Sequence, residues 1–155
     1  MGQPVVFKPL VGGPPTIDGQ RTVACTYMPT QFTGESGLPP VYVQVGDMAN
    51  TDNQGDHTLS EYEASVKSKG CPSTYTECGV RDTPSLGPGT FMFYSAIEAG
   101  GVRIAGCSVV IHDIGETPLQ ITAGARTGGT FPRYSGDTSI PMLCRWATGI
   151  ATALM

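Results

Sequence analysis

Residues 90–111, TFMFYSAIEAGGVRIAGCSVVI, form the apolar centre of the chain and decide its fold. Thr90 to Ile97 reads as a strand, because it is rich in aromatic residues that suit a pleated surface. The stretch Glu98-Ala99-Gly100-Gly101 is typical of a turn, and Val102 to Ile111 reads as the return strand. Residues 90–111 therefore predict a β-hairpin whose aromatic side chains pack in the core and across the strands.

The rest of the chain is predicted to add shorter strands to this hairpin. These strands are expected at residues 3–11, 21–28, 41–45 and 118–122. Residues 70–90 are expected to be irregular, and residues 124–136 to form a glycine-rich loop. The 155 residues include 21 glycines and 13 prolines, which interrupt helices and favour short strands joined by turns. We therefore expect one domain, residues 1–155, that is mainly β and folds as an antiparallel β-sandwich or barrel, a jelly-roll-like arrangement included.

One short helix is expected near residues 59–69. Thr58 and Glu61 form a capping box at its start, and lysines precede Gly70 at its end. The C-terminal segment, residues 142–155, fits two structures equally well. As a strand, residues 146–154 would alternate between two faces. As a helix, with Ser139 as its cap and Pro141 near its first turn, the segment would place an apolar stripe on one face: Leu143, Trp146, Ala147, Ile150 and Leu154.

The chain carries few charges. Charged residues make up 14% of it, against about 25% in an ordinary soluble domain. A chain with so few charges either stays soluble through its Thr, Ser, Gln and Asn side chains or has much of its surface covered by partners, and we expect the second. The net charge of −4 argues against a nucleic-acid partner. Residues 1–63 hold two basic and seven acidic side chains, whereas residues 64–155 hold seven basic and six acidic ones. A head-to-tail contact between copies would fit this asymmetry, and so would the absence of any contact.

The start of the chain lacks the basic region and the apolar run of a signal peptide. No stretch has the roughly 20 apolar residues needed to span a bilayer. We therefore expect a virion or cytoplasmic location and no membrane partner. In such a location reduced, buried cysteines are the default for all five: Cys25, Cys71, Cys78, Cys107 and Cys144. A disulfide between Cys71 and Cys78 is the open alternative, and the cysteine spacing does not suit zinc.

Residues 50–61 resemble the EF-hand calcium loop, in which oxygen ligands recur around a tight glycine turn. Gly55 would make that turn, and the ligands would be Asn50, Asp52, Gln54, Asp56, Thr58 and Glu61. Asn50 stands where the motif has Asp, and His57 stands where it has an apolar residue. The alternative is a polar loop that leads into a capped helix. Calcium is thus the one cofactor that the sequence suggests.

No catalytic constellation is recognisable. The pair His112-Asp113 lacks an oriented nucleophile, and residues 124–129 lack the spacing of a phosphate-binding loop. Because arginine and tryptophan suit interfaces, a contact patch is predicted instead. Its residues would be Arg126, Arg133, Arg145 and Trp146.

In composition alone, the chain resembles small accessory proteins of virus particles, such as the capsid decoration (cement) proteins of tailed phages. This resemblance implies a structural protein that self-associates with closed symmetry and stabilises a shell through subunit contacts. The alternative is a calcium- or carbohydrate-binding β module that uses the acidic loop 47–63. An enzyme of unrecognised type is the third hypothesis.

Overall fold

The central hairpin forms where the sequence predicts it. In the computed structural model of the chain, β7 (Phe91–Ala99) and β8 (Val102–Ile111) pair antiparallel. Gly100 and Gly101 connect them, and both have the positive φ that a two-residue hairpin turn favours. The predicted hairpin is therefore confirmed.

The structure describes residues 7–9, 16–17, 20–21, 24–29, 40–47, 64, 67–68, 73–111, 119–131 and 133–155. Its other strands are β1 (Phe7–Pro9), β2 (Thr16–Ile17), β3 (Gln20–Arg21), β4 (Ala24–Pro29), β5 (Val41–Asp47), β6 (Glu77–Asp82) and β9 (Leu119–Gly128). A short 3-10 helix, η2 (Pro84–Leu86), precedes β7, and the helix α2 (Ile140–Leu154) lies at the C-terminus.

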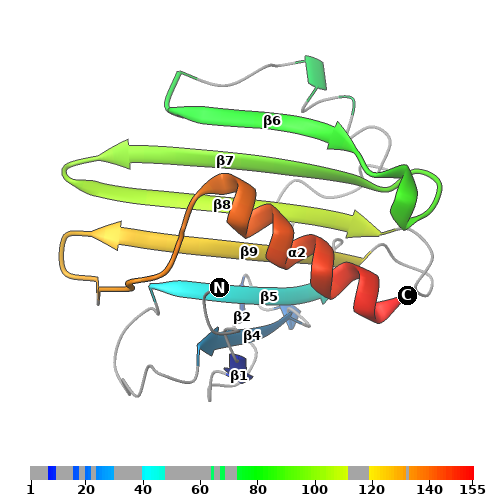
Figure 1. Cartoon of the computed structure of the whole chain (residues 1–155), viewed down its shortest axis with the longest axis horizontal. Coiled ribbons are helices and arrows are strands. Elements are labelled where there is room, and N and C mark those ends of the chain that lie inside the picture. Colours follow the sequence, from blue (N-terminus) through cyan, green and yellow to red (C-terminus); the bar gives the residue numbers. More distant parts are fainter. Residues whose placement is uncertain are drawn as a thin grey trace.

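Seven strands form one antiparallel sheet in the order β1-β4-β5-β9-β8-β7-β6, as Figure 1 shows. Strands β6 to β9 follow one another as a meander, and β5 joins them by pairing with β9. Strands β2 and β3 pair separately. The mainly β class is thus confirmed. A β-sandwich or barrel is not, because the sheet of the described strands stays open and a helix covers one of its faces.

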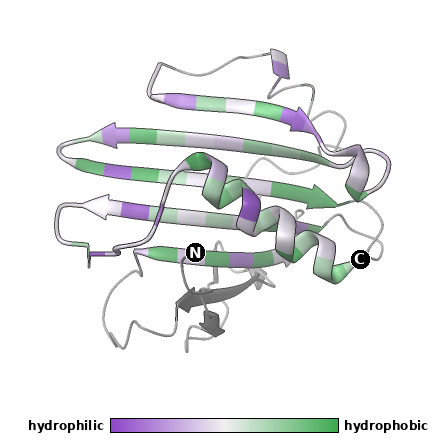
Figure 2. Ribbon diagram, viewed as in Figure 1, coloured by the Kyte–Doolittle hydropathy of each residue, from purple (hydrophilic) through white to green (hydrophobic). Residues whose placement is uncertain are grey.

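The two faces of the sheet have different surroundings, because side chains alternate along each strand. One face, here called the helix face, packs against α2. The other is called the opposite face. Apolar residues alternate along the strands and line α2, as the green segments in Figure 2 show. Between the helix face and α2 lies the main core, formed by Val41, Val43, Leu86, Ala96, Ala105, Cys107, Val109, Ile111, Ile121, Ala123, Ala125, Ile140, Leu143, Ala147 and Ala151.

The C-terminal segment, for which the sequence left two structures open, is a helix. Its buried residues Ile140, Leu143, Ala147 and Ala151 recur every three or four positions, so that one stripe meets the sheet. Ser139 is the N-cap residue and a proline lies in the first turn, as the sequence suggests. A strand would instead have turned part of this stripe away from the core.

One strand lies where the sequence predicts none, and another extends well beyond the strand predicted at 118–122. Strand β6 falls within residues 70–90, and β9 runs on to Gly128 through a segment expected to be a loop. Each contains a glycine opposite a tyrosine of the neighbouring strand: Gly79 faces Tyr94, and Gly124 faces Tyr42. Glycine weakens a strand because it has nothing to pack, and here the tyrosine ring supplies that packing.

Part of the predicted helix at 59–69 is described. Ala64, Lys67 and Ser68 are helical, and the rest of that range lies outside the described residues. Among the described helices none is long and apolar enough to cross a membrane, since α2 has 15 residues where about 20 are needed.

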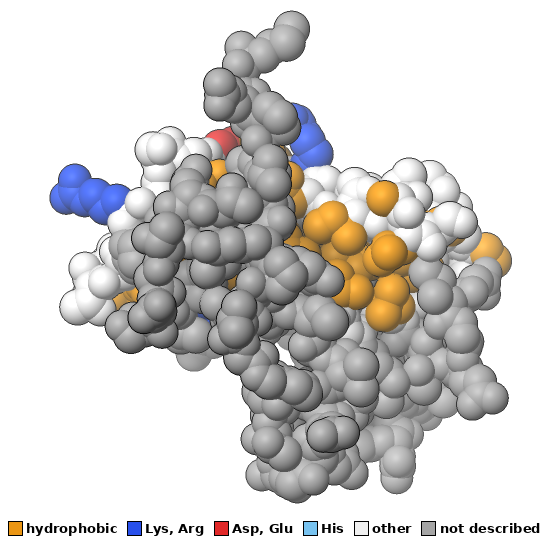
Figure 3. Space-filling model, turned by 90° about the horizontal axis from the view of Figure 1, so that it is seen from below, with side chains coloured by type: hydrophobic (Ala, Val, Ile, Leu, Met, Phe, Trp, Pro, Cys, Tyr) orange, Lys and Arg blue, Asp and Glu red, His pale blue; other side chains and the backbone are white. Residues whose placement is uncertain are grey.

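Charges are sparse and exposed on the described surface. The ion pairs Lys67–Asp82 and Arg103–Glu98 have N–O distances of 2.9 and 3.5 Å. Exposed pairs of this kind contribute little to stability. On the side of the molecule seen in Figure 3, the described apolar side chains gather in one area, and the Lys and Arg side chains lie at the periphery.

Candidate functional site

A single helix is too narrow to cover the helix face. A helix with its side chains is about 10 Å wide, whereas neighbouring strands lie about 4.8 Å apart, so one helix covers about two strands. Helix α2 packs mainly on β8 and β9 and less on β7. Helix α2 therefore leaves the helix face over β6 and part of β7 uncovered, and among the described residues a groove lies between α2 and this side of the sheet.

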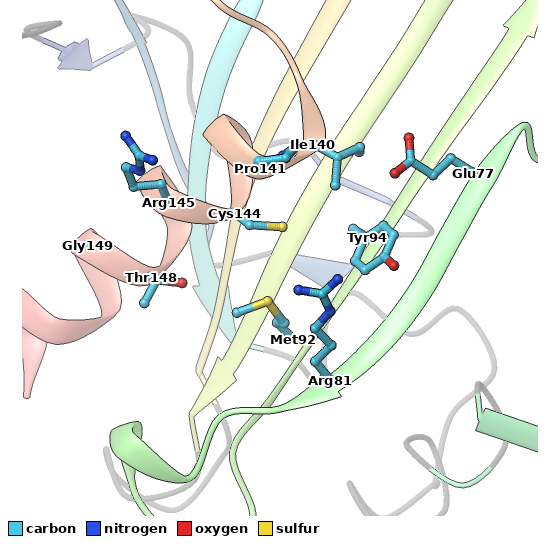
Figure 4. Close-up of a pocket in the computed structure, with 10 residues that line it drawn as sticks. All are labelled: Glu77, Arg81, Met92, Tyr94, Ile140, Pro141, Cys144, Arg145, Thr148 and Gly149. Atoms are coloured by element: carbon cyan, nitrogen blue, oxygen red, sulfur yellow. The ribbon is translucent and has the colours of Figure 1, made fainter. Parts of the chain in front are cut away.

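This groove, here called the α2–β6 groove, has a volume of about 530 Å³ and is shown in Figure 4. That volume lies within the range of about 300–1,000 Å³ typical of ligand sites. Strands β6 and β7 and the first three turns of α2 line it with Glu77, Arg81, Met92, Tyr94, Ile140, Pro141, Cys144, Arg145, Thr148 and Gly149.

The floor of the groove is apolar. Met92 and Tyr94 project from β7 into the space between β6 and α2 (Figure 4). The Tyr94 ring covers Gly79 so closely that a Cβ at position 79 would overlap it. Ile140 closes one end from α2. A methionine in such a floor adapts to varied apolar partners, since its side chain is unbranched and polarizable.

The rim of the groove is net positive. The Arg81 guanidinium lies 5.6 Å from the centroid of the Tyr94 ring, a cation–π arrangement. Arg145 is exposed on α2, and Glu77 supplies the one carboxylate among the described lining residues. The N-terminal half of α2 faces the groove and adds the positive end of its dipole. The groove thus combines an apolar floor with an electropositive rim.

Asp137 fixes the start of α2. Its Oδ1 accepts a hydrogen bond from the Ser139 backbone N–H at 2.8 Å. This bond, then the Ser139 hydroxyl and more weakly Arg145, lower the pKa of Asp137. Nearby, burial and then the charge of Asp137 raise the pKa of Tyr134. The Tyr134 ring packs edge-on against Trp146 with a centroid distance of 6.5 Å, so the segment before α2 is tied to the helix.

A disulfide joins α2 to the sheet. It bonds Cys107 of β8 to Cys144 of α2, whose Cα atoms are 5.0 Å apart. Cys107 is fully buried, whereas Cys144 also lines the groove. Cys78 is disulfide-bonded too. The prediction that all five cysteines are reduced is therefore wrong. Cys71 lies outside the described residues, so its pairing with Cys78 stays a prediction.

The sequence-predicted calcium loop, residues 50–61, lies outside the described residues, as does the pair at 112–113. Calcium binding by this loop therefore stays a prediction. In the described part of the chain, no group of three or more His, Cys, Asp or Glu side chains is placed to hold a metal ion.

The structure does not bring the four predicted interface residues together. Arg126 lies on the opposite face, where its guanidinium sits 4.4 Å from the centroid of the Tyr42 ring. Arg133 is exposed in the connection between β9 and α2. Trp146 is half-buried against the core. Arg145 is the member of this set that lines the groove.

Sequence reasoning missed Arg81 and Tyr94. The signal that points to them is a repeated spacing, Gly79-Val80-Arg81 in β6 and Gly124-Ala125-Arg126 in β9. In both strands the glycine lies under a tyrosine of the neighbouring strand, and the arginine two residues later lies over that ring. The spacing places glycine and arginine on the same face of a strand, because side chains alternate.

No protein-family model matches the chain, and no curated protein matches it either. The α2–β6 groove and the sheet itself are therefore the features from which a function can be inferred.

Proposed function

We propose that the chain is a structural, protein-binding domain that assembles with other protein chains through the α2–β6 groove. The observation that supports this most directly is the apolar floor of Met92 and Tyr94 beside the guanidinium groups of Arg81 and Arg145. Such a surface suits a segment that carries an apolar side chain next to a carboxylate. In this proposal the chain acts by binding, not by catalysis.

The chain itself contains segments of that kind. Residues 1–63 carry two basic and seven acidic side chains, a net charge of −5. A second copy can therefore supply the acidic segment, which makes self-association the first form of assembly to test. A head-to-tail contact of this type closes into a ring or extends into a larger array, as in the decoration of a capsid.

The disulfide bonds of the described cysteines favour an oxidising setting for this assembly. Cys107, Cys144 and Cys78 are disulfide-bonded. Structural disulfides persist outside the cell, in the periplasm and on virion surfaces, whereas cytosolic thiols are kept reduced. We therefore favour a virion or another oxidising location over the cytoplasm for the proposed role.

The test reverses the charge of the groove. Sedimentation velocity over a concentration series measures self-association, and panning of a displayed peptide library detects other partners. We expect concentration-dependent oligomers, or enriched peptides with Asp or Glu beside an apolar residue. Arg81→Glu together with Arg145→Glu should weaken either contact about tenfold or more, since each exposed charge pair contributes roughly 0.2–1 kcal/mol and reversal replaces attraction by repulsion.

Arg133→Glu is the matched control, because Arg133 is exposed and does not line the groove. It should leave both contacts unchanged. A chain that stays monomeric and enriches no acidic peptide contradicts the proposal, and so does binding that the double variant leaves intact.

A further inference from the structure

A second cavity lies on the opposite face of the sheet, with a volume of about 360 Å³. The strand register shows which residues lie side by side beneath this cavity. Tyr42 of β5, Gly124 of β9, Gly106 of β8 and Ser95 of β7 follow one another in a row across four strands. The next row on the same face contains Gln44, Thr122, Ser108 and Phe93. The cavity lies over these two rows.

Gly106 forms an open position in the floor. A Cβ built on Gly106 would meet nothing closer than the Ala123 carbonyl oxygen at 3.7 Å. Its neighbour Gly124 is different, because the Tyr42 ring already covers it. A glycine in a strand interior often marks a place where a ligand approaches the backbone. Gly106 and Gly124 lie side by side, and the Tyr42 side chain covers Gly124 but not Gly106. The hollow over Gly106 follows from this difference.

Next to this hollow the floor is polar and mutually hydrogen-bonded. Ser108 Oγ and Thr122 Oγ1 lie 2.7 Å apart, and Gln120 Nε2 donates to both oxygens at 3.2 Å. Ser108 is 4% exposed, so this network sits at the base of the cavity. Hydrogen bonds between neighbouring side chains hold them in fixed orientations, which prepares a site for a ligand before it binds.

The walls are aromatic, and the described lining carries no charge. Tyr42, Tyr75 and Phe93 surround the polar floor. No Asp, Glu, Lys, Arg or His occurs among the described residues that line this cavity. Arg126 lies over the Tyr42 ring on this face but does not line the cavity. A charged ligand would therefore lose its hydration without meeting an opposite charge among the described lining residues, which is costly.

The geometry points to an uncharged carbohydrate as the ligand of this cavity. Sugar rings present C–H groups that suit the negative faces of aromatic rings. Their hydroxyls both donate and accept hydrogen bonds, as the hydroxyls of serine and threonine and the amide of glutamine do. This site is made of residues other than those of the α2–β6 groove, and the inference does not depend on the proposed assembly.

The experiment titrates the purified chain with neutral oligosaccharides, namely maltotetraose, cellotetraose, mannotetraose and xylotetraose. Two-dimensional amide NMR and calorimetry report binding. We expect at least one of them to bind with a Kd at or below about 1 mM and to shift the amide signals of the cavity residues. Gly106→Val should weaken that binding tenfold or more by filling the hollow, and Gly106→Ala should weaken it less.

Ala153→Val is the control, since Ala153 is exposed on α2 and lines neither the α2–β6 groove nor this cavity. It should bind the sugar like the unaltered chain, and thermal melts should show that all three variants are folded. A short neutral peptide and tetragalacturonate serve as competing ligand classes. The inference is overturned if no neutral sugar binds at about 10 mM, if Gly106→Val binds unchanged, or if only the peptide or the charged sugar binds.

Discussion

At the scale of single residues, two tyrosines replace the packing that two glycines lack. Tyr42 covers Gly124 and Tyr94 covers Gly79, and each ring has an arginine guanidinium over it. These small stacks allow β6 and β9 to contain glycine and still pair along their length. The Tyr94 stack also forms part of the floor of the α2–β6 groove.

The two adjacent glycines of the opposite face should respond differently to alanine. In Gly124→Ala the new Cβ would overlap the Tyr42 ring, so we expect a loss of about 1–3 kcal/mol in the free energy of unfolding. In Gly106→Ala the Cβ fits, so we expect no loss or a gain of about 0.4–1 kcal/mol. Urea denaturation of both variants measures the contrast. Equal effects would show that Tyr42 does not control the site.

Asp137 should make the start of α2 sensitive to acid. The hydrogen bond from Ser139 lowers the pKa of Asp137 in the folded chain below its usual 3.8. A carboxyl whose pKa is depressed by folding adds stability above its unfolded pKa, and that stability is lost as the pH falls through the folded pKa. We expect Asp137→Asn to lower the melting temperature at pH 7 and to converge with the unaltered chain as the pH falls through the lowered pKa of Asp137. A difference between them that stays constant from pH 7 to 2 would contradict this assignment.

At the scale of elements, the position of α2 depends on packing and on one covalent bond. Leu143, Ala147 and Ala151 are fully buried against the sheet, and the Cys107–Cys144 disulfide fixes the helix to β8. Because Cys144 also lines the α2–β6 groove, the disulfide helps to set the distance between the groove walls.

Removal of this disulfide should cost substantial stability. The bond spans 37 residues of sequence, and the chain-entropy model gives about 4 kcal/mol for a closed loop of that size. We expect the double substitution Cys107→Ala and Cys144→Ala to lower the free energy of unfolding by roughly that amount. Guanidinium denaturation of the variant measures it, with the unaltered chain in reductant as a parallel sample. A loss below about 1 kcal/mol would mean that packing alone holds α2.

At the scale of the whole molecule, both candidate sites follow from one helix on a wide sheet. Helix α2 leaves the β6 side of the helix face uncovered, and the hollow at Gly106 lies on the opposite face. Because the groove has an electropositive rim, any assembly through it should weaken as salt is raised from about 0.05 to 0.5 M. Sugar binding in the uncharged cavity should not change over the same range, so a parallel salt series separates the two sites.

The sequence by itself determined the features that local pattern controls. Residues 91–111 form a hairpin because apolar strands flank two glycines that accept positive φ. The mainly β class follows from the same local signals, whereas for the C-terminal segment the sequence offered Ser139 only as the cap of one of two possible structures. The predicted sites at residues 50–61 and 112–113 fall outside the described residues, so their chemistry stays a sequence-based prediction.

Only the tertiary structure decided the features that depend on distant partners. Whether residues 140–154 form a helix depended on the sheet that buries one stripe of them. The extents of β6 and β9 depended on tyrosines of other strands, and the bond between Cys107 and Cys144 depended on α2 crossing β8. The same holds for both cavities, since each is lined by residues far apart in the chain. Propensity and spacing act between near neighbours, whereas packing and cavities arise only after the strands take their places beside one another.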